Sequence, residues 1–173
     1  MKLTIIYFFL VFFTINPIFG QEKDDDEKLF RLISQEVDTT KEIVRLETNN
    51  GVFEDILEVK NLCERADLKK LMNDPKRNMF AENACIKYDT IFQETFTSEN
   101  LEFLKSQINL VQNTQNPTRT HKMNIVFITK PIYNLSRKVA YVRILTSGGV
   151  STGVYIKENY EWKYKGIFHC YIY

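Results

Sequence analysis

The feature that most constrains the fold is a change of hydrophobic pattern near residue 120. Before that point, apolar residues recur three or four positions apart, which is the spacing of one face of an α-helix. After it, they alternate or run in short blocks rich in β-branched and aromatic residues, which is typical of strands. The sequence therefore predicts an α+β protein, with helices over 24–115 and mainly strands over 122–173.

The first helix is expected to begin at the acidic run Asp24–Glu27, because negative charge stabilises a helix N-terminus. It should extend for about 18 residues and end at Asn49–Gly51, which carries strong stop signals. Its apolar face would hold Leu29 or Phe30, Ile33, Val37, Thr40 and Val44.

Three more helices are predicted. The second runs from Val52 to about Met72, where Asn73–Pro75 stops it. The stretch Asn78–Phe96 fits a helix better, although part of it also fits a strand. The fourth begins at Thr97–Glu99, because a hydroxyl can cap free N–H groups there. The apolar positions of the second helix are Ile56, Val59, Leu62 or Cys63, Ala66 and Leu71, and those of the fourth are Leu101, Leu104, Ile108 and Val111.

Four strands are predicted in the last third: Met123–Lys130, Lys138–Thr146, Gly153–Lys157 and Trp162–Tyr173. Short connections join them, so the sequence predicts a four-stranded antiparallel meander that packs one face on the helices. The last strand is strand-prone on both faces, and we expect it to be buried, since an exposed edge of this kind promotes aggregation.

The first twenty residues read as a secretory signal peptide. Lys2 is followed by an apolar run over 5–13, then by Pro17, and by Gly20 before the polar Gln21. The run is much shorter than the roughly 20 residues of a membrane-spanning helix. We therefore expect cleavage near Gly20–Gln21, a secreted or periplasmic location, and a single mature domain over 21–173 without a stable membrane span.

The charge of the mature chain argues against two classes of partner. The first twenty residues contain one of the 23 basic residues and none of the 22 acidic ones, so basic and acidic residues balance after cleavage. Nucleic-acid-binding proteins normally show a basic excess, and attraction to a membrane surface needs a basic cluster. The sequence therefore favours neither nucleic acid nor a lipid surface as a partner.

Three cysteines leave two readings open. In the first, Cys63 and Cys85 form a disulfide and Cys170 stays a free thiol. In the second, all three are small buried apolar residues. Asn134–Ser136 matches the glycosylation sequon, a triplet that is common by chance.

No pattern of catalytic or metal-binding residues is recognisable. His121 and His169 lack a second histidine or cysteine at ligand spacing, apart from the adjacent Cys170, which should point to the opposite face of the strand. The glycine-rich stretch Ser147–Gly153 lacks the lysine and the following helix of a phosphate-binding loop. The acidic residues Glu54, Asp55, Glu58, Glu99 and Glu102 read as solvated helix faces. We predict no cofactor, no metal and no catalytic set.

The aromatic residues of the sheet are the remaining candidates. Most sheet aromatics stabilise cross-strand packing, but exposed ones can form a platform for a protein, a peptide or a glycan. The candidate binding surface comprises Tyr141, Tyr155, Tyr160, Trp162 and Tyr164.

Residues 88–173 resemble a recurring C-terminal pattern of uncharacterised secreted proteins of Bacteroidetes bacteria. The resemblance lies in Phe96–Leu101, Ile128–Tyr133, Val139–Val142, Ser147–Gly149, Tyr155–Lys157 and Glu161–Lys163. These proteins often carry cysteines around the Gly–Gly turn, which this chain lacks. The resemblance implies a helical N-terminal half, a C-terminal sheet and export, and it implies no activity.

These observations favour a soluble, exported, non-enzymatic binding or interaction protein. A second hypothesis is a cystatin-like or NTF2-like pocket that binds a small ligand or has weak hydrolytic activity, which requires an open cavity. A third is an inhibitor or immunity-type protein that blocks an enzyme.

Overall fold

The computed structural model describes residues 24–37, 40–46, 48, 49, 51–64, 85, 87, 89–108 and 125–172. The chain divides into two compact units, residues 1–37 and 38–173. The predicted signal peptide lies outside the described residues. In the part of the first unit that is described, residues 24–36 form a helix in which Leu29 and Ile33 are buried, as their spacing predicts.

The first predicted helix is wrong beyond residue 36. The chain forms strand β1 (Glu42–Arg45), where the sequence predicts that the helix continues. β1 pairs in parallel with β2 (Ile125–Ile128), and Leu46 N–H donates to the carbonyl of Ile128. The β-branched Ile43 and Val44 suit a strand, so ladder bonds to a distant segment override the local helical spacing.

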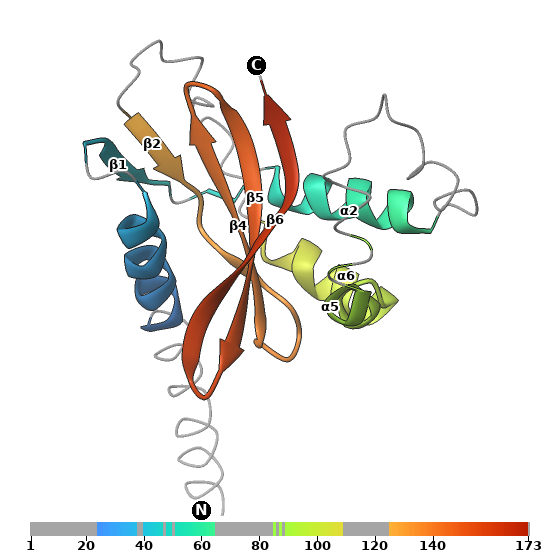
Figure 1. Ribbon diagram of the computed structural model, residues 1–173. Helices are drawn as coiled ribbons and strands as arrows, with labels where there is room; N and C mark the ends of the chain where they lie inside the picture. Colours follow the sequence, from blue (N-terminus) through green and yellow to red (C-terminus); the bar gives the residue numbers. More distant parts are fainter. Residues whose placement is uncertain are drawn as a thin grey trace, which may run out of the picture. The chain divides into compact units, whose positions relative to one another are not determined.

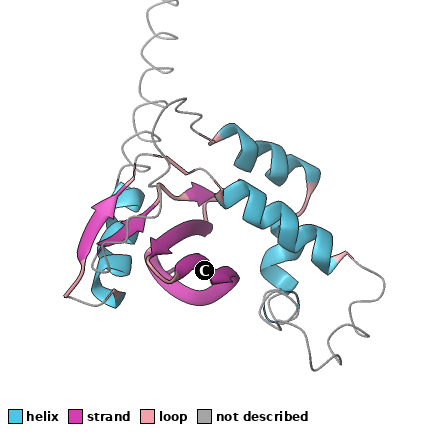
Figure 2. Ribbon diagram, turned by 90° about the horizontal axis from the view of Figure 1, so that it is seen from above, coloured by secondary structure: helices cyan, strands magenta, loops and turns pink. Residues whose placement is uncertain are grey.

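The sheet formed by the described residues is mixed and has six strands, which corrects the prediction of four antiparallel ones. Besides β1 and β2 it contains β3 (Ile132–Tyr133), β4 (Val139–Thr146), β5 (Gly149–Glu158) and β6 (Glu161–Ile172). The order is β1-β2-β4-β5-β6, with β3 paired to β4. The last three strands form the predicted antiparallel meander, and they twist strongly about one another (Figures 1 and 2). Among the described strands, β6 lies at an edge of the sheet, whereas the sequence predicts that it is buried.

In the described part of the chain, three helices cover one face of this sheet (Figure 1): α2 (Val52–Cys63), α5 (Asp89–Thr95) and α6 (Ser98–Ser106). Thr97 caps α6 as predicted, since its hydroxyl accepts from Asn100 N–H. Residues 85, 87 and 89–95 are helical, so the helical reading of that stretch is right for the described residues. The predicted positions Ala66, Leu71 and Val111 lie outside the described residues. The shared core comprises Val52, Phe53, Ile56, Val59, Phe92, Leu104, Ile132, Val139, Tyr141, Val154 and Phe168.

Two local features of β6 affect what its side chains face. β5 and β6 are joined by the two-residue turn Asn159–Tyr160, in which both residues have positive φ, 51° and 67°. Further along, the register shifts between Thr152 and Gly153, whose partners are His169 and Ile167. Phe168 is thus an extra residue, a β-bulge, and such a residue changes the direction of neighbouring side chains.

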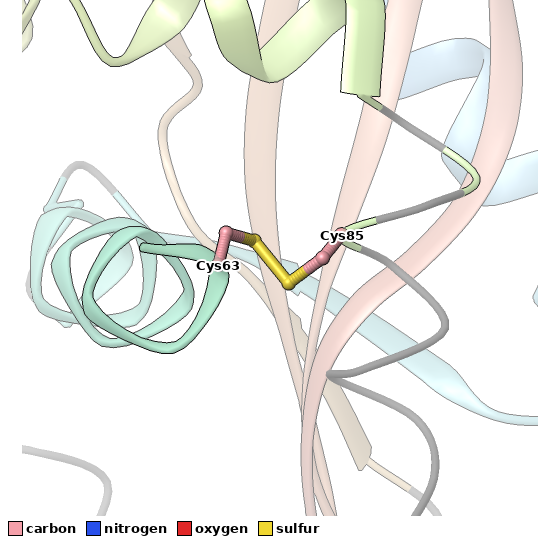
Figure 3. Close-up of a disulfide and its surroundings, with 2 residues drawn as sticks. All are labelled: Cys63 and Cys85. Atoms are coloured by element: carbon pink, nitrogen blue, oxygen red, sulfur yellow. A yellow bond between two sulfur atoms is a disulfide. The ribbon is translucent and has the colours of Figure 1, made fainter. Parts of the chain in front are cut away.

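A disulfide joins the C-terminal end of α2 to the segment that precedes α5 (Figure 3). It links Cys63 and Cys85, the pair considered from the sequence, and Cys170 is a free thiol. The sequon residue Asn134 is buried. Its side-chain amide donates to Glu94 and Ser136 and accepts from the N–H groups of Lys138 and Val139. A glycan on Asn134 would disrupt this turn.

Candidate functional site

The structure does not bring the five predicted aromatic residues together on one surface. Tyr141, Tyr155 and Trp162 are buried, so the candidate surface is wrong for these three. Tyr160 and Tyr164 are exposed, by 87% and 40%. The predicted platform is thereby reduced to two tyrosines, one in the β5–β6 turn and one in the first half of β6.

Packing explains why Tyr141 and Trp162 are inside. The Tyr141 hydroxyl is hydrogen-bonded to Thr95 at 2.6 Å, and its ring meets Phe168 edge to face. Burial raises the pKa of Tyr141, so this hydroxyl stays protonated. Trp162 packs on Tyr133, with ring centroids 5.7 Å apart. These are ordinary core roles for aromatic residues.

Of the two histidines, His121 lies outside the described residues, and His169 is buried in β6. His169 belongs to a polar row that crosses three neighbouring strands. Arg143 of β4 is the register partner of Thr152 of β5, and Thr152 is the register partner of His169 of β6. The bulge at Phe168 lets Phe168 join the core beneath the helices while the adjacent His169 also contacts α2.

Asp55 of α2 reaches all three members of this row. Its carboxylate accepts a hydrogen bond from the Thr152 hydroxyl. Oδ2 lies 3.3 Å from Nε of Arg143, and Oδ1 lies 3.3 Å from Nδ1 of His169. Burial raises the pKa of Asp55 above its usual value, against the opposing effects of the Thr152 bond and the positive charge of Arg143.

The second carboxylate of α2, Glu58, faces the other nitrogen of the same imidazole. Its Oε2 lies 3.3 Å from Nε2 of His169 and accepts a hydrogen bond of 2.6 Å from the Tyr171 hydroxyl. That bond lowers the pKa of Glu58 and raises the pKa of Tyr171 to about 12. The cluster thus extends from the buried Asp55 to the exposed Glu58 at its rim.

The contacts of this cluster attach α2 to the sheet, and their geometry differs from that of a catalytic dyad. A histidine acting as a general base needs one nitrogen on an orienting carboxylate and the other free for the substrate. Here both nitrogens lie 3.3 Å from carboxylate oxygens, Nδ1 from Asp55 and Nε2 from Glu58, so neither is free for a substrate. The Thr152 hydroxyl donates to the buried Asp55 carboxylate.

Sequence reasoning did not find this cluster. The spacing of Glu54, Asp55 and Glu58 predicts a solvated helix face, yet Asp55 is buried. The usable signals were the spacing of Asp55 and Glu58 by one helical turn and that of His169 and Tyr171 by two strand positions. Neither spacing predicts that α2 and β6 are in contact.

Within the described ranges, no group of three or more His, Cys, Asp or Glu side chains has the arrangement of a metal site. In the same part of the chain, no helix has the length and apolarity needed to span a membrane. Comparisons with protein-family models, with curated proteins and with solved structures gave no match for this chain.

Proposed function

We propose that this chain is an exported, non-enzymatic binding protein, and that it contacts its partner through the end of the β5–β6 hairpin. The contact surface is centred on Tyr160 and Tyr164, the two members of the predicted aromatic set that lie outside the core. The partner classes that suit such a surface are an extended peptide, a protein loop or a glycan, all of which pack against exposed tyrosine rings.

The conformation of Tyr160 carries the proposal. Two-residue hairpin turns with positive φ at both positions favour Asn followed by Gly, because a bulky residue in the left-handed region is strained. This turn has Asn159 followed by Tyr160 at φ 67°. The ring is 87% exposed and so gains little burial in return. A strained, exposed aromatic residue contributes little to the stability of the fold, which supports a role in contact with another molecule.

The surroundings of the two tyrosines resemble the edge of an interface. The Tyr164 ring packs on that of Tyr155, with centroids 5.3 Å apart, which limits its motion. Lys163 and Lys165 form ion pairs with Glu158 at 2.8 Å and 3.1 Å on the same hairpin. Aromatic anchors surrounded by charged residues are typical of protein interfaces.

Two observations favour a binding protein over the pocket hypothesis. The layer between α2, α5, α6 and the sheet is occupied by fully buried large side chains such as Tyr141 and Phe168, where a ligand cavity would have to lie. The imidazole of His169 is held between Asp55 and Glu58, which leaves neither nitrogen directed at a substrate.

Export is supported by three features of the chain. Its first twenty residues have the order of a secretory signal. The disulfide between Cys63 and Cys85 is of a kind that persists mainly in oxidising compartments. The resemblance of residues 88–173 to secreted proteins of Bacteroidetes points in the same direction.

The test uses immobilised arrays of short peptides and of glycans, probed with the purified protein. Tyr160→Gly relieves the strain of the turn and removes the ring, so the fold should be as stable or more stable. We expect at least one array class whose binding falls about tenfold or more in this variant, as for an interface hot spot.

Ile172→Ala is the matched control, because Ile172 is another exposed apolar residue and lies at the opposite end of β6 from Tyr160. Binding should be unchanged in this variant. Array binding that both variants reduce equally, or arrays without any Tyr160-dependent binding, would contradict the proposal.

A further inference from the structure

The two halves of the edge strand β6 differ in charge. The first half contains Glu161, Lys163 and Lys165, whereas the segment Gly166–Ile172 contains no Lys, Arg, Asp or Glu. Exposed strand edges are normally protected from pairing by charged side chains, by proline or by being short. The first half of β6 has charged side chains. Gly166–Ile172, which we call the neutral edge, has none, and the bulge at Phe168 leaves its last four residues, 169–172, as a regular strand.

The opposite edge of the sheet provides the comparison. β1 has four residues, and two of them, Glu42 and Arg45, are charged. It is therefore short and charged, as protected edges are. The neutral edge is longer, and three of its residues are exposed apolar or aromatic side chains, with Ile172 exposed by 77%. The three are Ile167, Tyr171 and Ile172.

We propose that the neutral edge pairs with the neutral edge of a second copy of this chain, in antiparallel register across a two-fold axis. The proposal concerns residues other than Tyr160 and Tyr164 and does not rest on the hairpin-tip contact. It assigns to β6 a self-association surface that would join the two sheets into one.

Symmetry and charge favour a second copy as the occupant. With the axis at Cys170, the two Cys170 residues face each other, and His169 faces Tyr171 of the other copy. These pairs juxtapose no acidic or basic residue of the Lys, Arg, Asp or Glu type, and Lys163 and Lys165 lie outside the paired segment. A two-fold pair also closes, because each neutral edge is used once and the remaining edges are the short, charged β1 strands.

The free thiol of Cys170 gives a sensitive reporter of this register. Directly opposed residues of antiparallel strands have Cα atoms about 4.5–5.5 Å apart, which lies within the range of about 4.4–6.8 Å that a disulfide accepts. Glutathione disulfide can oxidise such a pair: the two thiols lose two protons and two electrons and form one S–S bond, and the reagent is reduced to two glutathione thiols.

The experiment measures the molar mass of the purified protein by light scattering over a concentration series and follows oxidation on a non-reducing gel. We expect a dimer at high concentration and a dimer linked through Cys170 after treatment with glutathione disulfide. Ile172→Lys should give a monomer in both measurements, because a lysine on the neutral edge supplies the charge by which strand edges resist pairing. Leu135→Lys, the same change at an exposed apolar residue elsewhere, should leave both results unchanged.

Three outcomes would overturn the inference: a monomer throughout the series, a dimer that Ile172→Lys leaves intact, or a dimer in which glutathione disulfide does not link Cys170. Failure here is distinguishable from failure of the proposed function. Tyr160→Gly should weaken array binding without changing the mass, and Ile172→Lys should change the mass without weakening array binding.

Discussion

Asp55 on α2 and His169 on β6 face each other across the helix–sheet interface, with Oδ1 and Nδ1 3.3 Å apart. Both side chains are almost fully buried, and the same carboxylate also contacts Arg143 and Thr152. A single acidic residue thus connects one helix to three strands. Because buried charges require partners, these contacts fix where α2 lies on the sheet as well as adding stability.

Replacing Asp55 should therefore destabilise the fold strongly. Asp55→Ala leaves the side chains of Arg143, Thr152 and His169 without this carboxylate, and removing one member of a buried charge cluster typically costs about 3–5 kcal/mol. We expect a loss of that order in the free energy of unfolding, measured by urea denaturation. Glu54→Ala, one position earlier and exposed, is the control and should change it by less than about 0.5 kcal/mol. Equal stability of the two variants would show that the cluster contributes little.

Ionisation of Glu58 should make the free energy of unfolding depend on pH in the acidic range. Its pKa in the folded protein is lowered from 4.5, chiefly because the Tyr171 hydroxyl donates to the carboxylate. A lowered pKa means that ionised Glu58 stabilises the fold above pH 4.5, and that this contribution is lost as the pH falls through the folded pKa. Glu58→Gln should be less stable than the wild type at neutral pH, and the difference should shrink in acid.

The measurement is urea unfolding of both proteins over a pH series. The raised pKa of Asp55 acts in the opposite direction, but Asp55 is present in both proteins, so the difference between them reports mainly on Glu58. Glu102 is an exposed carboxylate on α6 and serves as the control. The free energy of unfolding of Glu102→Gln should differ little from that of the wild type at every pH. A difference for Glu58→Gln that stays constant down to strongly acidic pH would argue against this role.

Elements that depend on local chemistry could be predicted from the sequence. The start of α6 follows from Thr97, whose hydroxyl caps a helix wherever the chain turns into one. The β4–β5–β6 meander follows from short turns between alternating segments. In both cases the residues that determine the structure are close together in the chain.

Elements that depend on distant contacts could not be predicted. β1 is a strand because β2, far along the chain, supplies its ladder partner. The polar cluster requires the bulge at Phe168, which lets His169 contact α2. Simple alternation does not reveal a bulge, so the sequence does not predict that His169 contacts α2. Without that contact, nothing distinguishes Asp55, which is buried, from its exposed neighbour Glu54. Alternation also does not show which face of a strand the helices cover. The sequence therefore does not separate the buried Tyr141, Tyr155 and Trp162 from the exposed tyrosines.

Gly51 should tolerate no side chain, for two separate reasons. Its φ of 83° lies in the left-handed region, which costs other residues about 1–2 kcal/mol. A Cβ atom there would also lie 1.4 Å from Nη1 of Arg143, so the guanidinium would have to move away from its place beside Asp55. We expect Gly51→Ala to lower the free energy of unfolding by at least about 2 kcal/mol.

Gly148→Ala is the control for Gly51→Ala, since the nearest heavy atom to its added Cβ is Thr146 Oγ1 at 3.9 Å. Denaturation of the two variants separates the specific effect from the general cost of adding a methyl group. If Gly51→Ala were as mild as Gly148→Ala, the close approach of Arg143 to this turn would be disproved.

The disulfide between Cys63 and Cys85 should stabilise the fold mainly through the unfolded chain. The two residues are 22 positions apart, and closing a loop of that length is worth about 3 kcal/mol by chain entropy. The double variant Cys63→Ala/Cys85→Ala should therefore unfold at lower urea concentration, by an amount that corresponds to about this energy. Cys170→Ala removes the free thiol and should change the stability much less. Because reduction acts on the same bond, dithiothreitol should destabilise the wild type and leave the double variant unaffected; sensitivity of the double variant to the reductant would refute this assignment.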